Sequence, residues 1–202
     1  MKLYYSKGAC SLSPHITACE AELPIELISV DLKSKRTVTG EDFRLINPNG
    51  YVPVLILDDG NKLTEGPAIV QYLADQAPDK KLAPLAGTFE RYQLQQWLNF
   101  IATEIHKGGF SPLFNPATPE AAKKVAIASL TSRLETVAEH LSARAFLLGD
   151  RFTVADVYLF VTLSWGAYVD IDISRWPVLA DYAAKISARP AVQKALKEEG
   201  LV

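Results

Sequence analysis

Cys10 is the residue of this sequence best placed to do chemistry, because it lies in Gly-Ala-Cys-Ser-Leu-Ser-Pro-His, between a predicted strand and a predicted helix. A thiol at a helix N-terminus faces unpaired N–H groups and the positive end of the helix dipole, which favour the thiolate and lower the thiol pKa. The alternative is an inert, half-buried small hydrophobic residue. Cys19 lies inside the same predicted helix, and we interpret it as a core residue. Ser13 stands where a C-x-x-C pair needs its second cysteine, so Cys10 can form a mixed disulfide but cannot resolve it internally.

Two further segments offer polar groups to a ligand. Pro53 precedes an apolar strand and cannot donate to a ladder, which leaves the N–H and C=O of Val52 for a ligand. The alternative is an ordinary turn-to-strand proline. Glu65 and Gly66 precede a predicted helix with Pro67 in its first turn, where backbone N–H groups can bind a carboxylate and Glu65 can bind an ammonium group. The alternative is a helix cap with an acid that the helix dipole favours.

A fourth candidate lies on the predicted helix 88–108. Asn99, Thr103, His106 and Lys107 are spaced to share one face. The apolar stripe of this helix lies roughly opposite and contains Leu94, Trp97, Leu98, Ile101 and Ile105. The pair 108–109, Gly-Gly, is expected to end or bend the helix, and such bends often lie where a ligand approaches. The alternative is a solvated helix face.

No spacing among His, Cys and acidic residues resembles a zinc or iron site, so the sequence predicts no metal. His15 and His140 are interpreted as structural or solvated. The sequence also has no phosphate-binding glycine loop, no nucleophile elbow and no dinucleotide fingerprint.

The elements that must position these residues change character along the chain. The first 80 residues predict a βαβ unit, an irregular segment and then a ββα unit, which together indicate a mixed sheet of the α/β or α+β class. The expected strands are 2–5, 25–30, 52–57 and 62–63, with a hairpin turn at 58–61, and the expected helices are 11–23 and 67–76.

The second half is predicted to be all helical. Residues 81–87 are the core of a linker rich in proline and glycine, between a domain at 1–80 and a domain at 88–202. Thr153 and Asp156 form a variant of the capping box in front of an apolar run. The expected helices are 88–108, 119–141, one through the run 157–169, 174–188 and 191–198.

Composition limits the classes of function. The length of 202 residues suits two small domains, and the net charge of −2 without a basic block argues against nucleic acid as a partner. The longest apolar run is shorter than a membrane span, so we expect a buried helix and no membrane association. The N-terminus resembles no signal peptide, and two cysteines make no disulfide framework, so we expect a cytoplasmic enzyme.

Together these features resemble the cytosolic glutathione S-transferases over essentially the whole chain. The segments Gly-Ala-Cys-Ser-Leu-Ser-Pro-His around Cys10 and Glu-Ile-His-Lys-Gly around His106 resemble the bacterial beta class. The resemblance implies a thioredoxin-like N-terminal domain, an all-α C-terminal domain that binds the second substrate, a homodimer, and glutathione as the co-substrate. It also implies a cis peptide bond between Val52 and Pro53, which X-Pro bonds adopt at low cost.

The resemblance also assigns expected roles. Cys10 and His106 are the expected catalytic residues, with Cys10 opposite the glutathione sulfur. Val52 is expected to pair with the cysteinyl unit, and Lys35 to meet the glycyl carboxylate. Glu65 and Gly66 hold the γ-glutamyl end, although transferases of this kind commonly have Ser at the position of Gly66. The second domain is expected to bring Asn99, Thr103, Glu104, Ile105, His106 and Lys107 to glutathione, with Phe110, Phe114 and Trp165 near the electrophile, and Pro53, Thr153 and Asp156 in structural roles.

The leading hypothesis is an enzyme that conjugates the thiolate of glutathione to small electrophiles, in detoxification. An alternative on the same fold is a thiol–disulfide oxidoreductase that works through a mixed disulfide of Cys10 with glutathione. A further alternative is a non-enzymatic binding or scaffold protein, since fold alone does not fix function.

Overall fold

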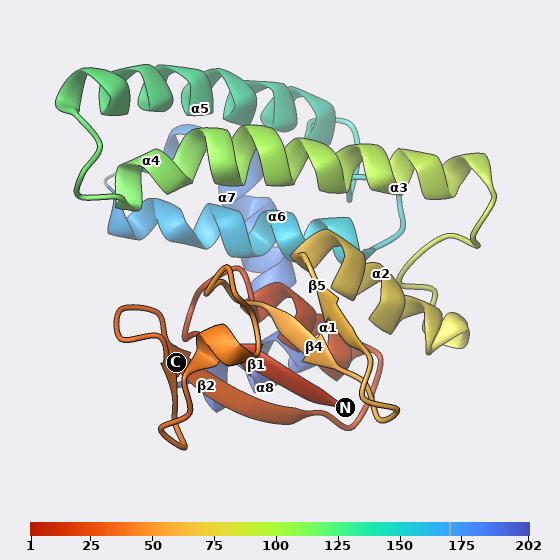
Figure 1. Cartoon of the computed structure of the whole chain (residues 1–202). Helices are drawn as coiled ribbons and strands as arrows, with labels where there is room; N and C mark the ends of the chain where they lie inside the picture. Colours follow the sequence, from red (N-terminus) through yellow and green to blue (C-terminus); the bar gives the residue numbers. More distant parts are fainter. Residues whose placement is uncertain (170) are drawn as a thin grey trace. The chain divides into compact units, whose positions relative to one another are not determined.

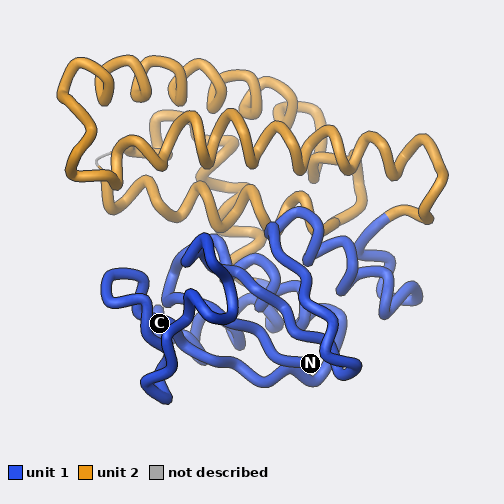
Figure 2. Tube along the Cα trace, viewed as in Figure 1, with its two compact units in different colours: residues 1–83, 189–202 blue, residues 84–188 orange. Residues whose placement is uncertain are grey.

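The computed structural model describes residues 1–169 and 171–202, and Figure 1 shows the elements that they form. The chain divides into two compact units, which we call unit 1 (residues 1–83 and 189–202) and unit 2 (residues 84–188; Figure 2). The last helix therefore groups with unit 1, whereas the sequence analysis had included it in the helical domain 88–202. Within the described residues, no helix is both long enough and apolar enough to span a membrane.

Unit 1 is built on a mixed five-stranded sheet, which confirms the predicted class. The strand order is β3-β2-β1-β4-β5; β1 runs parallel to β2, and the other neighbouring pairs are antiparallel. The bounds are β1 Lys2–Tyr5, β2 Glu26–Asp31, β3 Arg36–Thr37, β4 Val54–Ile56 and β5 Lys62–Thr64. The short strand β3 lies in the segment interpreted as irregular, because two residues are too few to show a period.

The two faces of this sheet follow from the alternation of side chains along β1. Leu3 pairs with Leu55, and the next residue, Tyr4, pairs with Val54 on the opposite face. Helices α1 (Leu12–Glu20) and α2 (Gly66–Asp75) cover the Leu3 face, and the other face packs against the fully buried Phe43. This packing fixes the ends of α1 and α2 that carry the candidate residues.

Helix α8 (Pro190–Glu198) completes unit 1 and packs on α1. Arg189 donates from Nε and Nη2 to the two carboxylate oxygens of Glu20, at 2.6 and 2.8 Å. His15 is fully buried between two acids, with Nδ1 3.0 Å from Glu199 and Nε2 2.8 Å from Glu198. Burial opposes a charge on this ring, but the hydrogen bonds with Cys19, Glu199 and Glu198 outweigh it and raise the pKa of His15 to about 10. These contacts of His15 join α1 to the end of α8.

Unit 2 is helical throughout its regular elements. Its bounds are α3 Phe89–Phe100, a π-helical segment Ile101–Phe110, α4 Ser111–Phe114, α5 Glu120–Leu141, α6 Val154–Ser164, short 3-10 turns at Trp165–Tyr168 and Ile173–Arg175, and α7 Pro177–Ser187. The apolar residues of the predicted stripe are buried, apart from the half-buried Trp97.

The expectation that the Gly-Gly pair ends or bends the first helix of unit 2 is wrong in its first part, because the helical path continues through Gly108 and Gly109 to α4 (green in Figure 1). The glycines instead permit close approach. A Cβ on Gly109 would lie 2.8 Å from Cδ1 of Leu130 on α5, and a Cβ on Gly108 would lie 2.8 Å from the carbonyl oxygen of Thr103. The wide π-helical turn can therefore pack directly against α5.

The predicted capping box is confirmed at the start of α6. The buried Asp156 carboxylate accepts from the amide and hydroxyl of Thr153 at 2.8 and 2.9 Å, from the amide of Leu147 at 2.8 Å and from the Tyr182 hydroxyl at 2.8 Å. Burial raises the pKa of Asp156 although these four hydrogen bonds act in the opposite direction. Both carboxylate oxygens of Asp156 thus accept hydrogen bonds that hold the start of the apolar helix α6.

Candidate active site

Cys10 lies in the turn that leads into α1. Its side chain is partly exposed, and α1 begins two residues later. The thiol donates to the carbonyl oxygen of Val52, with Sγ and O 3.4 Å apart. The amide of Ser6 donates to the Ser11 hydroxyl at 3.0 Å, which ties the turn to the end of β1. The structure therefore brings two of the sequence-predicted residues, Cys10 and Val52, into direct contact.

The segment before β4 carries the next groups. The Val52–Pro53 bond is cis, as the resemblance implied. Val52 is 7% exposed and packs in the core cluster on the Tyr4 face of the sheet. Position 66 is close by, since a Cβ built on Gly66 would lie 3.9 Å from Cγ of Pro53. The start of α2 and the Val52–Pro53 step are thus neighbours.

Lys35 approaches the same segment from the β2–β3 connection. It has a positive φ of 59°, and its Nζ donates to the carbonyl oxygen of Gly50 at 2.9 Å. The ammonium group also lies 5.6 Å from the ring centre of Tyr51. The positive charge of Lys35 therefore lies beside Gly50 and Tyr51, the two residues that precede Val52.

Glu65 immediately precedes α2 and has an unusual backbone conformation, with φ 67° and ψ 114°. Such a conformation in a non-glycine residue costs on the order of 1–3 kcal/mol and often marks a functional site. The side chain is exposed, and among the described residues it caps none of the N–H groups of α2. The carboxylate and the first turn of α2 are therefore both presented to solvent.

His106 has a different environment in unit 2. Its Nδ1 lies 2.7 Å from the hydroxyl of Tyr158, and its ring centre lies 4.8 Å from that of Trp165. Burial, helped by the charge of Lys107, lowers the pKa of His106 to about 4, so the imidazole is neutral near pH 7.

The expectation that His106 shares an exposed face with Asn99, Thr103 and Lys107 is wrong. Those three side chains are exposed, whereas His106 turns toward the buried Tyr158 and Trp165. The cause is the π-helical segment, whose i→i+5 bonding has more residues per turn than the α-helix on which the i+7 spacing was based.

The other residues expected from unit 2 are engaged within it. Glu104 forms an ion pair with Arg133 at 2.8 Å, and the Thr103 hydroxyl donates to the carbonyl oxygen of Asn99 at 3.0 Å. Ile105 is fully buried and belongs to the apolar stripe that packs into the core, so the expectation that it contributes to the glutathione site stays a prediction.

The aromatic residues expected near the electrophile form one cluster. The ring centres of Phe110 and Phe114 lie 5.7 and 5.9 Å from that of Trp165. Phe110 is fully buried and Trp165 is 5% exposed, while Phe114 is 46% exposed. Phe114 is therefore the member of this cluster open to solvent, and the other two support it.

Sequence reasoning missed Tyr158, the hydrogen-bond partner of His106. It lies within the apolar run of α6, where only its hydroxyl distinguishes it from the surrounding core. A buried tyrosine hydroxyl usually has a partner, which is the one signal that the sequence offered.

A separate depression of about 810 Å³ lies in unit 2, between the start of α3, the end of α5 and the loop 147–151. Trp97, His140 and Arg144 are among its lining residues. Within the described chain, its lining includes none of the sequence-predicted site residues, so we do not assign the predicted chemistry to it.

Comparison with known proteins identifies relatives over the whole length of this chain. The sequence pattern of the glutathione S-transferase N-terminal domain matches residues 9–76, and that of the C-terminal domain matches residues 101–190. The glutathione S-transferase GstA of Escherichia coli O157:H7 is 47% identical over the full length of both chains.

Solved structures agree with this result. The bacterial transferase BphK, solved as a ternary complex, is 60% identical with a TM-score of 0.97, covering 99% of this chain and 100% of its own. A sphingomonad glutathione S-transferase in complex with glutathione is 49% identical with a TM-score of 0.96, and the beta-class enzyme of Sphingomonas chungbukensis is 47% identical with a TM-score of 0.97; both match over the full length of both chains. The chain belongs to the glutathione S-transferase family and resembles its bacterial beta class.

Proposed function

We propose that this glutathione transferase binds reduced glutathione through the polar groups of unit 1 and directs its thiolate to small electrophilic carbons. The observation that carries the proposal is the contact of Cys10 with the Val52 carbonyl, beside the start of α2 and the Lys35 ammonium. Glutathione has a thiol, one ammonium group and two carboxylates. This part of unit 1 has a thiol, an acid, a helix N-terminus and a cation, which are complementary to those groups.

Each group of glutathione has a proposed partner. The backbone of Val52 pairs with the cysteinyl unit as a neighbouring strand would. Glu65 binds the γ-glutamyl ammonium, the amide of Gly66 binds its carboxylate, and Lys35 binds the glycyl carboxylate in exchange for the Gly50 carbonyl. The sphingomonad relative, whose structure contains glutathione, supports the choice of ligand.

The second unit has a proposed role in orientation. The family resemblance implies that Asn99, Thr103, Glu104 and Lys107 contribute to glutathione binding and that Phe114 contacts the electrophile. His106 is neutral near pH 7 because of its lowered pKa, so it acts as a hydrogen-bonding dipole and not as a positive charge. Together with Cys10 and the backbone dipoles of the α1 and α2 N-termini, it favours the thiolate form of glutathione.

We further propose that the enzyme is a cytoplasmic homodimer that detoxifies small hydrophobic electrophiles, as the family resemblance implies.

The test is the rate of glutathione conjugation to an aryl halide by the wild type and by Cys10→Ala and Glu65→Ala. We expect both variants to lower kcat/KM, and Glu65→Ala to act mainly through the KM for glutathione. Glu26→Ala is the matched control, because Glu26 is another exposed acid of unit 1. Rates that depend on neither Cys10 nor Glu65 would contradict the proposal.

Thiol–disulfide exchange is the second candidate, because the Cys10 thiol is partly exposed. Its thiolate would attack the glutathione sulfur of a glutathione–substrate disulfide and release the substrate thiolate. A second glutathione thiolate would then attack the Cys10–glutathione disulfide, releasing oxidised glutathione and the Cys10 thiolate. Loss of disulfide reductase activity in Cys10→Ser would support this reaction, and an unchanged reductase rate would exclude it.

A further inference from the structure

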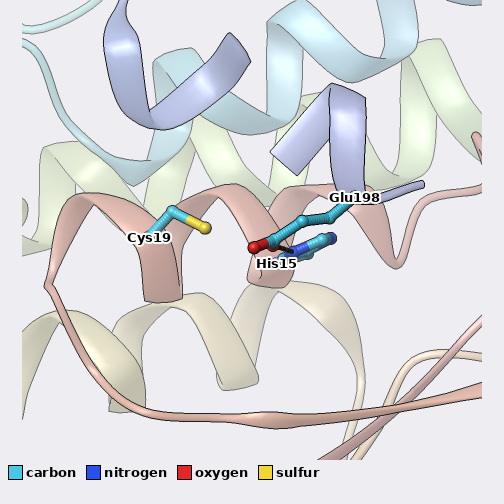
Figure 3. A group of neighbouring side chains, drawn as sticks. All are labelled: His15, Cys19 and Glu198. Atoms are coloured by element: carbon cyan, nitrogen blue, oxygen red, sulfur yellow. Dashed lines mark hydrogen bonds and ion pairs between the residues drawn. The ribbon is translucent and has the colours of Figure 1, made fainter. Parts of the chain in front are cut away.

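Unit 1 contains a second cluster of chemically capable side chains, formed by His15, Cys19 and Glu198 (Figure 3). His15 and Cys19 are four residues apart on α1, so they lie one turn apart on the same face. Glu198 ends α8, the helix that packs on α1, and it is 183 positions from His15 in the sequence. One nitrogen, one sulfur and one carboxylate oxygen from these residues all lie within 4.8 Å of one another.

The three ligand atoms are near enough to one another for a single metal ion to bind them after small side-chain movements. Zinc bonds to histidine nitrogen and carboxylate oxygen at about 2.0–2.2 Å and to thiolate sulfur at about 2.3 Å, so neighbouring ligand atoms are about 3.3–3.8 Å apart. Nε2 of His15 is 2.8 Å from Oε2 of Glu198, which is hydrogen-bond distance. A cation bound by both atoms requires them to move apart by roughly half an ångström.

Glu199 supplies the outer support that metal-bound histidines usually have. Its Oε1 is 3.0 Å from Nδ1 of His15, and its Oε2 accepts from the amide of Gly8 at 2.9 Å. The Glu199 side chain is fully buried, so this contact fixes the ring and leaves Nε2 directed at Glu198. A carboxylate on the far nitrogen of a ligating histidine orients the ring and increases its basicity.

The cluster is open on one side. His15 is fully buried, but the Glu198 side chain is 41% exposed and Cys19 is partly exposed. Lys194 is the neighbouring cation at this edge, with its Nζ 3.9 Å from Oε1 of Glu198 and its side chain 64% exposed. A metal ion and a bound water can therefore reach the ligand atoms without opening the core.

We propose that His15, Cys19 and Glu198 form a binding site for zinc or another thiolate-preferring divalent transition metal, with water as the fourth ligand. The thiolate ligand selects against magnesium and calcium, which prefer oxygen ligands alone. Binding releases the thiol proton and the proton on Nε2, because both atoms must donate a lone pair. The ion would join the first helix of unit 1 to its last helix and stabilise the fold by mass action. Sequence spacing does not reveal the site, because α1 supplies only two of its ligands.

The test uses the full chain with Cys10→Ala, which leaves Cys19 as its one thiol. Titration with Co²⁺ should give one equivalent of tetrahedral cobalt with a thiolate-to-cobalt charge-transfer band, and Zn²⁺ should displace it. Cys19→Ser should remove the band, and Glu198→Gln should weaken binding at least about tenfold. The matched control is Glu26→Gln, an exposed acid of the same unit, which should bind cobalt like the parent.

Thermal unfolding gives a second readout that does not use cobalt. Zn²⁺ should raise the Tm of the parent, a chelator should reverse the rise, and Cys19→Ser should abolish it. Cobalt spectra without the charge-transfer band, or metal affinity that is unchanged in both Cys19→Ser and Glu198→Gln, would overturn the proposal. His15 is left intact in these experiments because its buried ion pairs support the fold.

Discussion

The two units use their polar side chains in different ways. In unit 1, Glu65 is exposed, and the partly exposed Cys10 residue donates from its thiol to the Val52 carbonyl at 3.4 Å. In unit 2, Asp156 is buried with four hydrogen-bond donors around it, and His106 is held by Tyr158. Cys10 and Glu65 are therefore available to a ligand, whereas Asp156 and His106 are engaged with neighbouring helices and loops of unit 2. We expect substitution of Glu65 to change glutathione affinity, and substitution of Asp156 or of the His106 partner to change stability first.

The largest effect is expected from Asp156→Ala. The substitution removes an acceptor from two backbone amides and two hydroxyls that are buried around it. Loss of a helix cap together with buried unsatisfied donors should lower the free energy of unfolding by about 3 kcal/mol or more. Urea denaturation measures the change. Asp181→Ala, at an exposed position of α7, is the control. An equal effect of both variants would contradict the claim that the buried hydrogen bonds of Asp156 stabilise the fold.

The parts of the fold that the sequence predicted well depend on local patterns, and the parts that it missed depend on contacts between distant segments. The mixed sheet, the helical second half and the Thr153–Asp156 box follow local patterns of two to four residues, and the structure confirms them. The π-helical segment does not follow such a pattern, and its close approach to α5, where a Cβ on Gly109 would lie 2.8 Å from Cδ1 of Leu130, involves a residue distant in sequence. The inward turn of His106 was missed for that reason. The cluster of His15 with Glu198 was missed because its partners come from opposite ends of the chain.

A smaller effect is expected from Tyr158→Phe. It removes the hydroxyl that lies 2.7 Å from Nδ1 of His106 and keeps the ring in the core. One lost hydrogen bond should lower the free energy of unfolding by about 1 kcal/mol. The effect on the glutathione Kd should be smaller than that of Glu65→Ala. Tyr92→Phe removes an exposed hydroxyl from α3 and should be neutral; a Tyr158→Phe protein as stable as this control would show that the bond contributes nothing.

The pH dependence of stability tests the environment of His106. Its pKa is lowered from 6.5 to about 4 in the folded chain, so the unfolded chain takes up a proton first as the pH falls. This residue should therefore reduce stability progressively from about pH 6.5 down to pH 4, and add no dependence above that range. The measurement is the unfolding free energy of the wild type and His106→Gln between pH 4 and 8. An NMR titration that gave His106 a pKa near 6.5 would refute the buried, neutral ring.

The smallest expected effect is an increase in glutathione affinity. Gly66→Ser adds a hydroxyl at the start of α2, where a Cβ meets only Cγ of Pro53 at 3.9 Å, an ordinary contact. A new hydrogen bond to the γ-glutamyl carboxylate, less the cost of ordering the side chain, should strengthen glutathione binding by about two- to tenfold. Gly66→Ala adds the Cβ without the hydroxyl and separates the two contributions. Equal affinities of the Ser and Ala variants would show that no such bond forms.

The central claim is that the polar groups of unit 1 bind glutathione, and calorimetric titration of the reduced chain with reduced glutathione tests it most directly. We expect saturable binding of one glutathione per chain, weakened by about 10- to 100-fold in Glu65→Ala, as is typical for loss of a hydrogen bond to a charged group. The exposed acid Glu26, replaced in the same way, should leave the Kd unchanged. No saturable binding at millimolar glutathione, or equal Kd values for Glu65→Ala and the wild type, would contradict the claim.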